Sequence, residues 1–303
     1  MELEFKPVVA GDIDRLRPFY GLRPNKTCDS VFLDSFLWKD YYHVQCAVSE
    51  GRAVLWLMEK DGQVSTAMPL CREEDLPYFF QQMVDYFSGV LHKPFYISLA
   101  DEEAVQCLNL DPALFEVEEQ VDLKDYLYSG EELRKLEGKK FVKKRNHLNG
   151  FKRTYEGRYE YRRLCCSDRH EVWQFMERWR QHREEVGAME LSLDYEVAGI
   201  HDILKNCSNL YVRMAGVYID GQLEAFTIGS LNVRENMAVI HIEKANPEIR
   251  GLYQFINQQF LINEFPEAEL VNREDDVGME GLRKAKMSYY PIGFARKYMV
   301  RER

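Results

Sequence analysis

The order of amphipathic and apolar segments along the chain constrains its fold more than any other feature of the sequence. In the first half, two short helices near residues 12–20 and 29–38 precede three strands near 43–48, 53–59 and 63–69, with Asp61-Gly62 as a hairpin turn. A long helix follows, because apolar residues from Leu76 to Leu91 recur at helical spacing. A strand near 95–99, a helix capped by Asp101 and a strand near 115–123 complete this half.

The second half repeats this order. Helices near 172–179 and 195–205 precede strands near 210–219, 222–229 and 237–243, with Asp220-Gly221 as a turn. A helix near 252–260, a strand near 269–272, a helix near 279–286 and a strand near 293–300 follow. From the long helix onward, corresponding elements are displaced by about 176 residues, as an internal repeat requires. The order predicts a mixed α/β fold of two similar domains, 1–136 and 137–303.

Composition excludes several classes of protein. No apolar run reaches the roughly 18 residues that span a bilayer, and the first residues lack the pattern of a secretory signal, so we expect a cytoplasmic protein. The seven cysteines are odd in number and scattered, which argues against a disulfide framework, and we interpret Cys165 and Cys166 as packing residues. No C-x-x-C or H-x-x-x-H pattern occurs, so no metal site is expected. The net charge of −10 argues against general coating of nucleic acid.

One segment reverses this acidic character. Residues 139–153 hold seven Lys and Arg and no acid, and on a helix Phe141, Leu148 and Phe151 would face the domain. Like charges repel unless an anion is present, so the segment predicts a site for a phosphate-rich donor; a solvated basic linker helix is the alternative. The residues assigned to this site are Lys143, Lys144, Arg145, Asn146 and His147.

A second motif joins a strand end to a helix start. Glu243 ends a strand, and Arg250-Gly251 precede the helix that contains Tyr253. Helix starts attract anions, so Arg250, Gly251 and Tyr253 are assigned to donor binding. Glu243 is a candidate proton acceptor, with an ion pair to Lys244 or Arg250 as the alternative.

A third motif, residues 272–278, is rich in charge and is followed by cations on the next helix. Asp276 is a second candidate base, and the cluster can equally be a structural network of ion pairs. The binding residues assigned here are Asn272, Arg273, Glu274, Arg283 and Lys286.

As a set, these motifs carry a resemblance to a known family. Residues 138–149, 242–254 and 272–286 are similar to the C-terminal domain of phosphatidylglycerol lysyltransferases, and the element order resembles two tandem acyltransferase units of the GCN5-related N-acetyltransferase (GNAT) type. The usual coenzyme A loop is compressed here to Arg250-Gly251-Leu252-Tyr253. The resemblance implies a stand-alone bacterial transferase with no permanently bound cofactor.

The expected reaction moves an acyl or aminoacyl group from an anionic donor, acyl-CoA (a coenzyme A thioester) or aminoacyl-tRNA, to an amine or hydroxyl. The acceptor would be a small molecule or a lipid headgroup. No G-x-S-x-G motif indicates a covalent nucleophile. Two alternatives stay open: a non-catalytic module that binds an acyl carrier or a tRNA acceptor end, and a basic segment that contacts an anionic lipid surface.

Overall fold

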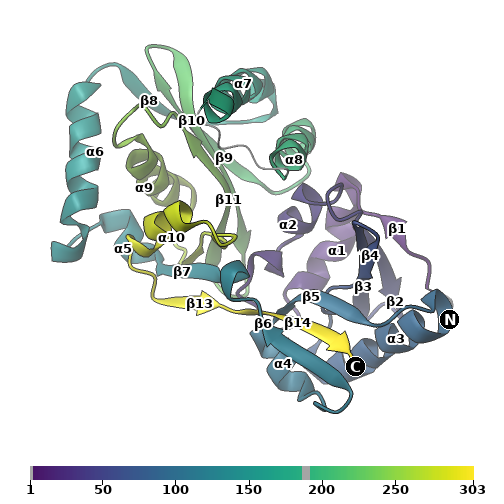
Figure 1. The fold of residues 1–303 in the computed structure, drawn as a ribbon. Coiled ribbons are helices and arrows are strands. Elements are labelled where there is room, and N and C mark those ends of the chain that lie inside the picture. The colour runs from purple at the N-terminus through teal and green to yellow at the C-terminus, as the bar shows by residue number, and fades with distance from the viewer. Residues whose placement is uncertain (1–2, 186–191) are drawn as a thin grey trace.

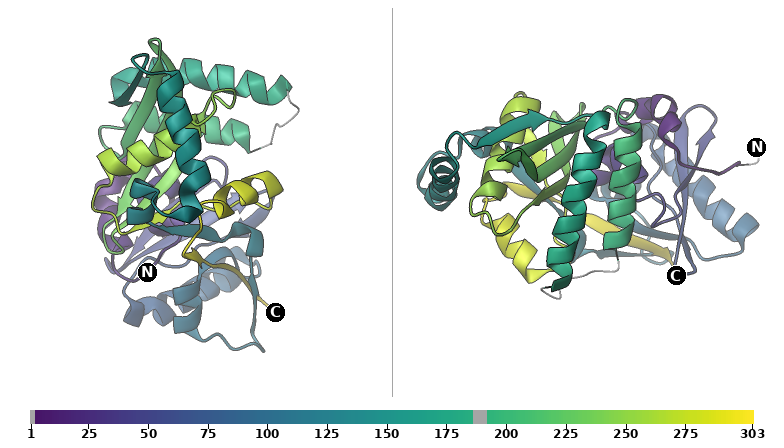
Figure 2. Two further views of the ribbon diagram at one scale, coloured as in Figure 1. Left: turned by 90° about the vertical axis from the view of Figure 1, so that its left-hand side faces the viewer. Right: turned by 90° about the horizontal axis from the view of Figure 1, so that it is seen from above.

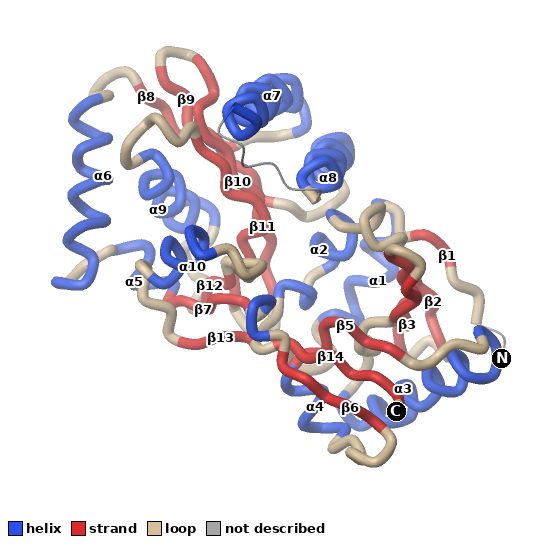
Figure 3. The backbone as a smooth tube through the Cα atoms, in the orientation of Figure 1, coloured by secondary structure: helices blue, strands red, loops and turns tan. Residues whose placement is uncertain are grey.

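The computed structural model describes residues 3–185 and 192–303 as a mixed α/β protein. Within these residues the strands form a seven-stranded, a four-stranded and a three-stranded sheet. The seven-stranded sheet lies between two layers of helices (Figures 1 and 3). This is the fold class that the sequence predicts.

The first half begins with an antiparallel sheet in chain order, β1 (Lys6–Pro7), β2 (Gln45–Ser49), β3 (Ala53–Lys60) and β4 (Gln63–Ser65). Asp61 and Gly62 have φ of 51° and 79°, which confirms the predicted tight turn between β3 and β4. The helices of this half are α1 (Ile13–Tyr20), α2 (Phe32–Leu37), α3 (Leu76–Tyr86) and α4 (Glu102–Leu108). Asp101 Oδ1 accepts a hydrogen bond from Ala104 N at 2.9 Å, so the predicted cap of α4 is confirmed.

The seven-stranded sheet has the order β13-β7-β12-β11-β10-β9-β8. Its strands are β7 (Asp125–Ser129), β8 (Tyr159–Arg163), β9 (Arg213–Ile219), β10 (Gln222–Asn232), β11 (Met237–Ala245), β12 (Leu270–Asn272) and β13 (Gly293–Ala295). The apolar pattern predicted neither β7 nor β8, because both are short and rich in polar or aromatic residues. It also merged β13 with the strand that follows it.

The two halves exchange strands. The last strand, β14 (Lys297–Glu302), lies between β5 (Tyr96–Asp101) and β6 (Phe115–Glu119) of the first half, pairing antiparallel with both. In return, β7 pairs with β12 and β13 of the second half. Lys297 Nζ donates to Asp125 Oδ1 at 2.7 Å, and this ion pair, 1% and 0% exposed, joins the two exchanged strands. Two of the sheets therefore contain strands from both sides of residue 136. The division into domains 1–136 and 137–303 stays a prediction.

Helices α5 (Gly130–Lys135), α6 (Val142–Thr154) and α9 (Leu252–Glu264) cover one face of the large sheet. Figure 2 shows α6 on the outside of this layer. Phe141, Leu148 and Phe151 of the basic segment are buried, as predicted, and each such burial contributes roughly 1.5–3 kcal/mol.

The other face carries α7 (Arg169–Glu185), α8 (Leu193–Asn206) and the first half of the chain. One apolar cluster contains Phe36 of α2, Ile203 of α8 and Phe226 of β10. A Cβ on Gly199 would lie 2.2 Å from the Leu37 carbonyl oxygen, so α8 and α2 pack in direct backbone contact. The two halves therefore share a continuous core.

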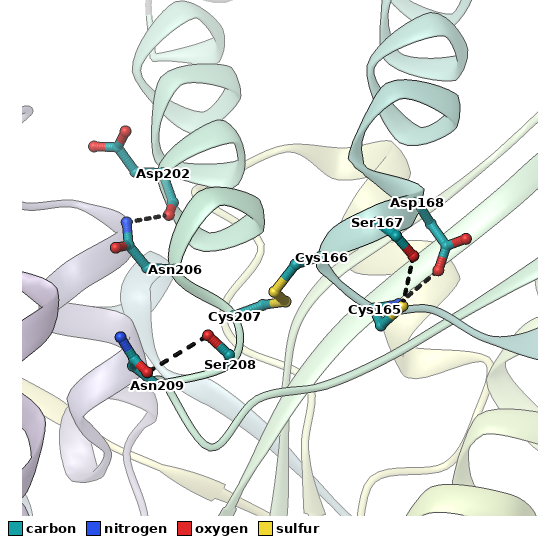
Figure 4. The surroundings of a disulfide bond; sticks show 9 residues. All are labelled: Cys165, Cys166, Ser167, Asp168, Asp202, Asn206, Cys207, Ser208 and Asn209. Carbon is teal, nitrogen blue, oxygen red and sulfur yellow. Dashed lines mark hydrogen bonds between the residues drawn. A yellow bond between two sulfur atoms is a disulfide. The ribbon is translucent and has the colours of Figure 1, made fainter.

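A disulfide joins Cys166, in the turn before α7, to Cys207 at the end of α8 (Figure 4). The interpretation of Cys165 and Cys166 as packing residues is wrong, because Cys166 is bonded and Cys165 is exposed. Cys165 Sγ lies 2.9 Å from Ser167 Oγ. Sequence spacing gave no sign of the bond, because folding brings the start of α7 next to the end of α8.

Candidate functional site

A β-bulge in β11 sets the direction of the central side chains. Ile228 of β10 pairs with Ile242 of β11, but the next residue, Gly229, pairs with Ile240. His241 is therefore an extra residue: Ile242 packs in the apolar cluster of α7 and α8, and His241 contacts Ser230 and Glu274. The alternation resumes one position later, which turns Glu243 toward α9. The bulge thus separates two groups of polar residues on opposite faces of the sheet.

Glu243 is held by two side chains on the α9 face. Its Oε1 accepts from Arg273 Nη2 at 2.9 Å and its Oε2 accepts from Asn257 Nδ2 at 2.8 Å. The Glu243 and Arg273 side chains are 10% and 14% exposed. Neither Lys244 nor Arg250 is the partner: Lys244 pairs with Glu196 at 2.8 Å. Arg273 Nη1 is buried and has no hydrogen-bond partner among the described residues, so this guanidinium keeps a free donor.

Lys144 of α6 reaches the same place. Its Nζ donates to Ser288 Oγ at 2.6 Å and lies 3.8 Å from the centroid of the Tyr289 ring. Burial and the positive charge of Arg273 lower the pKa of Lys144 to about 8, although the negative charge of Glu243 acts in the opposite direction. Arg273 Cζ also lies over the Tyr289 ring, 4.8 Å from its centroid. Lys144, Arg273 and Glu243, assigned from three separate motifs, are therefore close enough to act on one ligand.

Gly251 fixes the distance between α6 and α9. It is the N-cap residue of α9, with φ of 89°, and a Cβ there would lie 2.2 Å from the His147 carbonyl oxygen. The group that lies against Gly251 is thus the backbone of α6 at His147. Burial and the charges of Arg250 and Lys144 lower the pKa of His147, so two cations, Arg250 and Lys144, lie near this imidazole. The arrangement concentrates positive charge along one side of α6.

Other residues of the basic segment and of α9 have different surroundings. Arg145 Nη1 donates to the carbonyl of Gly138 at 2.8 Å and to that of Leu136, which holds the start of α6. Lys143 and Asn146 are exposed. Asn146 borders a surface hollow with Asn149, Lys152 and Arg153. Tyr253 packs beside the apolar cluster of Phe255.

Glu274 and Asn272 face the first half of the chain. Glu274 Oε1 lies 2.9 Å from His241 Nδ1, and His241 Nε2 lies 2.8 Å from Ser230 Oγ. Asn272 Nδ2 donates to Asp125 Oδ2 at 3.0 Å and to the Lys26 carbonyl at 2.8 Å. The Ser230–His241–Glu274 chain has the connectivity of a nucleophile, base and orienting acid, but His241 is 0% exposed and Ser230 is buried. Sequence motifs could not reveal it, because the bulge creates it.

Asp276 and the cations of α10 (Glu280–Met287) form a compact network. Arg283 Nε donates to Asp276 Oδ2 at 2.9 Å and Arg283 Nη2 donates to Asp122 Oδ1 at 2.7 Å. Hydrogen bonds from Arg283, and also from Tyr126 and Gly278, lower the pKa of Asp276 to about 2. Lys286 Nζ donates to the carbonyls of Arg273 (2.6 Å) and Asp275. These contacts fix the loop that carries Arg273.

The family model for the C-terminal region of phosphatidylglycerol lysyltransferase matches residues 21–301. The chain belongs to this family. It is thus a relative of transferases, and the resemblance expected from the three motifs is confirmed.

Solved structures agree with this membership. A conserved protein of unknown function from Bacteroides thetaiotaomicron is 27% identical, with a TM-score of 0.90 over 100% of both chains. L-PGS from Bacillus licheniformis is 15% identical, with a TM-score of 0.69 over 99% of this chain and 93% of that one. FemX is 11% identical, with a TM-score of 0.64 over 98% and 97%. The last two likenesses show a shared fold.

An uncharacterized protein of Mycoplasmoides gallisepticum is 28% identical over 178 residues, which are 58% of this chain and 56% of that protein. The chain thus matches little more than half the length of this curated relative. Among the described residues, no helix is both long and apolar enough to cross a membrane.

Proposed function

We propose that the chain transfers an aminoacyl or acyl group from an activated, phosphate-bearing donor to an amine or hydroxyl acceptor. The observation that carries this proposal is the meeting of Lys144 and Arg273 beside Glu243. Two cations, one of them with an unpartnered donor, suit an anionic donor or a developing oxyanion. Family membership supports a transferase.

In the proposed reaction, the acceptor nitrogen or oxygen attacks the acyl carbonyl carbon. Arg273 Nη1 and Lys144 Nζ hold the carbonyl oxygen as negative charge develops on it. Glu243 takes the proton that the acceptor loses and returns it to the leaving oxygen of tRNA or sulfur of coenzyme A, as the old ester or thioester bond breaks. Asp276 holds no proton near neutral pH and is a weak base there, so we place it in the network that positions Arg273.

The exposed cations of α6 would guide the donor. Lys143 and Arg153 are exposed, and Arg250 lies near His147. Such a basic side on an acidic molecule attracts a polyanion and orients it. Both aminoacyl-tRNA and acyl-CoA fit this chemistry. A lipid headgroup or a small amine as acceptor, and a cytoplasmic location, stay predictions.

The test supplies radiolabelled aminoacyl-tRNA or acyl-CoA with a pool of small amines, or with vesicles that contain phosphatidylglycerol. A labelled product in one donor arm is the expected result. Lys144→Ala should reduce the rate by roughly 10–100-fold, the value of one charged hydrogen bond. Lys205→Ala, which removes an exposed lysine of α8 on the opposite face of the sheet, is the matched control and should retain the rate.

The rival function is binding without transfer. If donors bind to the wild-type protein with Lys144-dependent affinity but no acceptor yields a product, the chain is a binding module. A contact between the basic segment and a lipid surface predicts sedimentation with vesicles that rises with the fraction of anionic lipid. Sedimentation that ignores this fraction would exclude that contact.

A further inference from the structure

The Cys166–Cys207 bond lies where two helix ends meet, and solvent reaches both of its residues (Figure 4). Cys166 opens a short 3-10 turn that runs directly into α7, and Cys207 is the residue that follows α8. Both cysteines are half-buried, whereas Cys28, Cys46 and Cys71 are buried. Access of a thiol is the first requirement for exchange, and this bond meets it.

Each of the two turns is closed by its own hydrogen bonds. Before α7, Asp168 N donates to the Cys165 carbonyl at 3.0 Å, and Cys165 N donates to Asp168 Oδ2 at 2.7 Å. At the end of α8, Asn206 Nδ2 donates to the Asp202 carbonyl at 2.8 Å, and Asn209 N donates to the Asn206 carbonyl at 2.9 Å. Opening the S–S bond breaks none of these contacts, so both turns can persist in a folded protein whose bond is open.

The position of Cys166 sets the direction of exchange. The N–H groups at the start of a helix stabilise a thiolate, so Cys166 is the better leaving group and Cys207 Sγ is the atom attacked. A small thiolate forms a new S–S bond with Cys207 while the electron pair of the old bond leaves with Cys166. A second thiolate then attacks the sulfur of the bound small molecule and releases Cys207. Two small thiols are oxidised to one disulfide, and their two protons go to the two cysteines.

The helices that this bond joins act together on one buried lysine. Lys244 Nζ lies 2.8 Å from Glu196 Oε2 of α8 and 4.2 Å from the ring centroid of Trp179 of α7. Lys244 follows Glu243 in β11, and α8 also packs against the α2 backbone at Gly199. The position of α8 relative to α7 therefore affects both β11 and the first half of the chain.

We propose that Cys166 and Cys207 form a reversible switch, opened by a low-molecular-weight thiol and closed by its disulfide. In the closed form α7 and α8 are one unit. In the open form the end of α8 separates more readily from α7, which weakens the hold on Lys244 and on α2. Disulfides in reducing compartments are usually transient or redox-sensing, so a cytoplasmic location would agree with this role. The switch goes beyond the proposed function, because it rests on the bond alone and stands whether or not transfer is found.

The first experiment equilibrates the full chain at neutral pH, without denaturant, in mixtures of reduced and oxidised glutathione. Free thiols are then blocked and located by peptide mass spectrometry. We expect Cys166 and Cys207 to pass together from bonded to blocked as the reduced share rises, and to return when oxidised glutathione is restored. Cys107, which is exposed and free, should be blocked throughout. A bond that opens only after urea unfolds the protein, or that does not close again, would overturn the proposal.

The second experiment compares hydrogen exchange in the closed and open forms. We expect the amides of α8 to exchange at least roughly ten-fold faster in the open form, and those of α3, in the other half, to be unchanged. Equal exchange of α8 in both forms would show that the bond holds nothing in place and would also overturn the proposal.

Two variants assign the effect to the bond. Cys207→Ser should exchange like the open form even with oxidised glutathione present. Cys165→Ser removes the exposed thiol next to the bond and is the matched control, which should open and close like the wild-type protein. A Cys165→Ser variant that cannot close the bond would contradict the pairing of Cys166 with Cys207. If Cys207→Ser does not fold, the two forms of the wild-type protein still decide.

Discussion

Arg273 and Glu274 are consecutive residues whose side chains serve opposite faces of the large sheet. Arg273 pairs with Glu243 at 2.9 Å on the α9 face, while Glu274 contacts His241 at 2.9 Å on the face toward the first half. Glu274 has φ of 57°, a left-handed conformation that is uncommon for a residue with a side chain. This local turn allows one short loop to supply both the proposed transfer site and the Ser230–His241–Glu274 chain.

The pKa of Lys144, about 8, makes donor binding depend on pH. Below this value the ammonium is present and attracts an anion; above it the charge is lost. We expect donor affinity in the wild-type protein to weaken as pH rises through about 8, and Lys144→Arg to remove this step. Affinity measured between pH 6.5 and 9.5 checks it, and a rate that instead rises to pH 8 would make Lys144 a base rather than an anion ligand.

Removing the carboxylate of Glu243 would leave the buried Arg273 charge without its partner. Breaking a buried ion pair in this way costs about 3–5 kcal/mol. We expect Glu243→Ala to lower the free energy of unfolding by that amount in urea, and Glu243→Gln to lower it less while still reducing transfer. Normal transfer by Glu243→Gln would show that Glu243 carries no proton in the reaction.

Gly251 is required by sterics as well as by its backbone conformation. Gly251→Ala places Cβ against the His147 carbonyl, whereas Gly221→Ala has a similar φ, 82°, but open space around it. We expect Gly221→Ala to lose roughly 1–2 kcal/mol from the left-handed conformation alone, and Gly251→Ala to lose clearly more. Thermal or urea unfolding of the two variants compares them, and equal losses would contradict the close packing of α6 on α9.

The contribution of Asp276 to the free energy of unfolding depends on pH. Because its pKa falls from 3.8 to about 2 on folding, the contribution is complete above about pH 4 and is lost as pH falls through about 2. The difference in unfolding free energy between the wild-type protein and Asp276→Asn should therefore shrink from pH 5 toward pH 2. A difference that stays constant over this range would mean that Arg283 does not hold the carboxylate.

The Cys166–Cys207 bond closes a loop with a sequence separation of 41 residues. A bond of this kind stabilises by about 2–4 kcal/mol through the unfolded chain. We expect Cys166→Ser to lower the free energy of unfolding by that amount and Cys165→Ser to leave it nearly unchanged. Thiol counting by mass spectrometry should find five free cysteines in protein purified without reductant; seven would contradict the bond.

Local patterns predicted the local elements well. Helical spacing identified α3 and α9, and the residue pairs Asp61-Gly62 and Asp220-Gly221 identified hairpin turns that the structure contains. The pattern could not predict β7 or the place of β14, because strand partners far apart in sequence leave no trace in a single chain. The internal repeat stays a prediction.

The same limit applies to the site. The motifs identified Lys144, Glu243 and Arg273 as candidate site residues, because the sequence alone shows which charged residues lie near the ends of predicted strands and helices. Their pairing was not visible, and neither was the bulge at His241, since it is a matter of register between β10 and β11. The cavity of ≈ 80 Å³ that Asp34 and Trp56 line was not predicted, because both residues lie in segments whose pattern indicates an ordinary core.

The exchange of β7 and β14 has a consequence for biosynthesis. Strands β5 and β6 have left the ribosome long before residues 297–302 are made, yet their shared partner is β14. Until then the two strands present unpaired edges, which are prone to join other chains. The first half of this protein can therefore complete its sheet only after translation of the second, so the nascent chain depends on its last strand, or on a chaperone that shields those edges meanwhile.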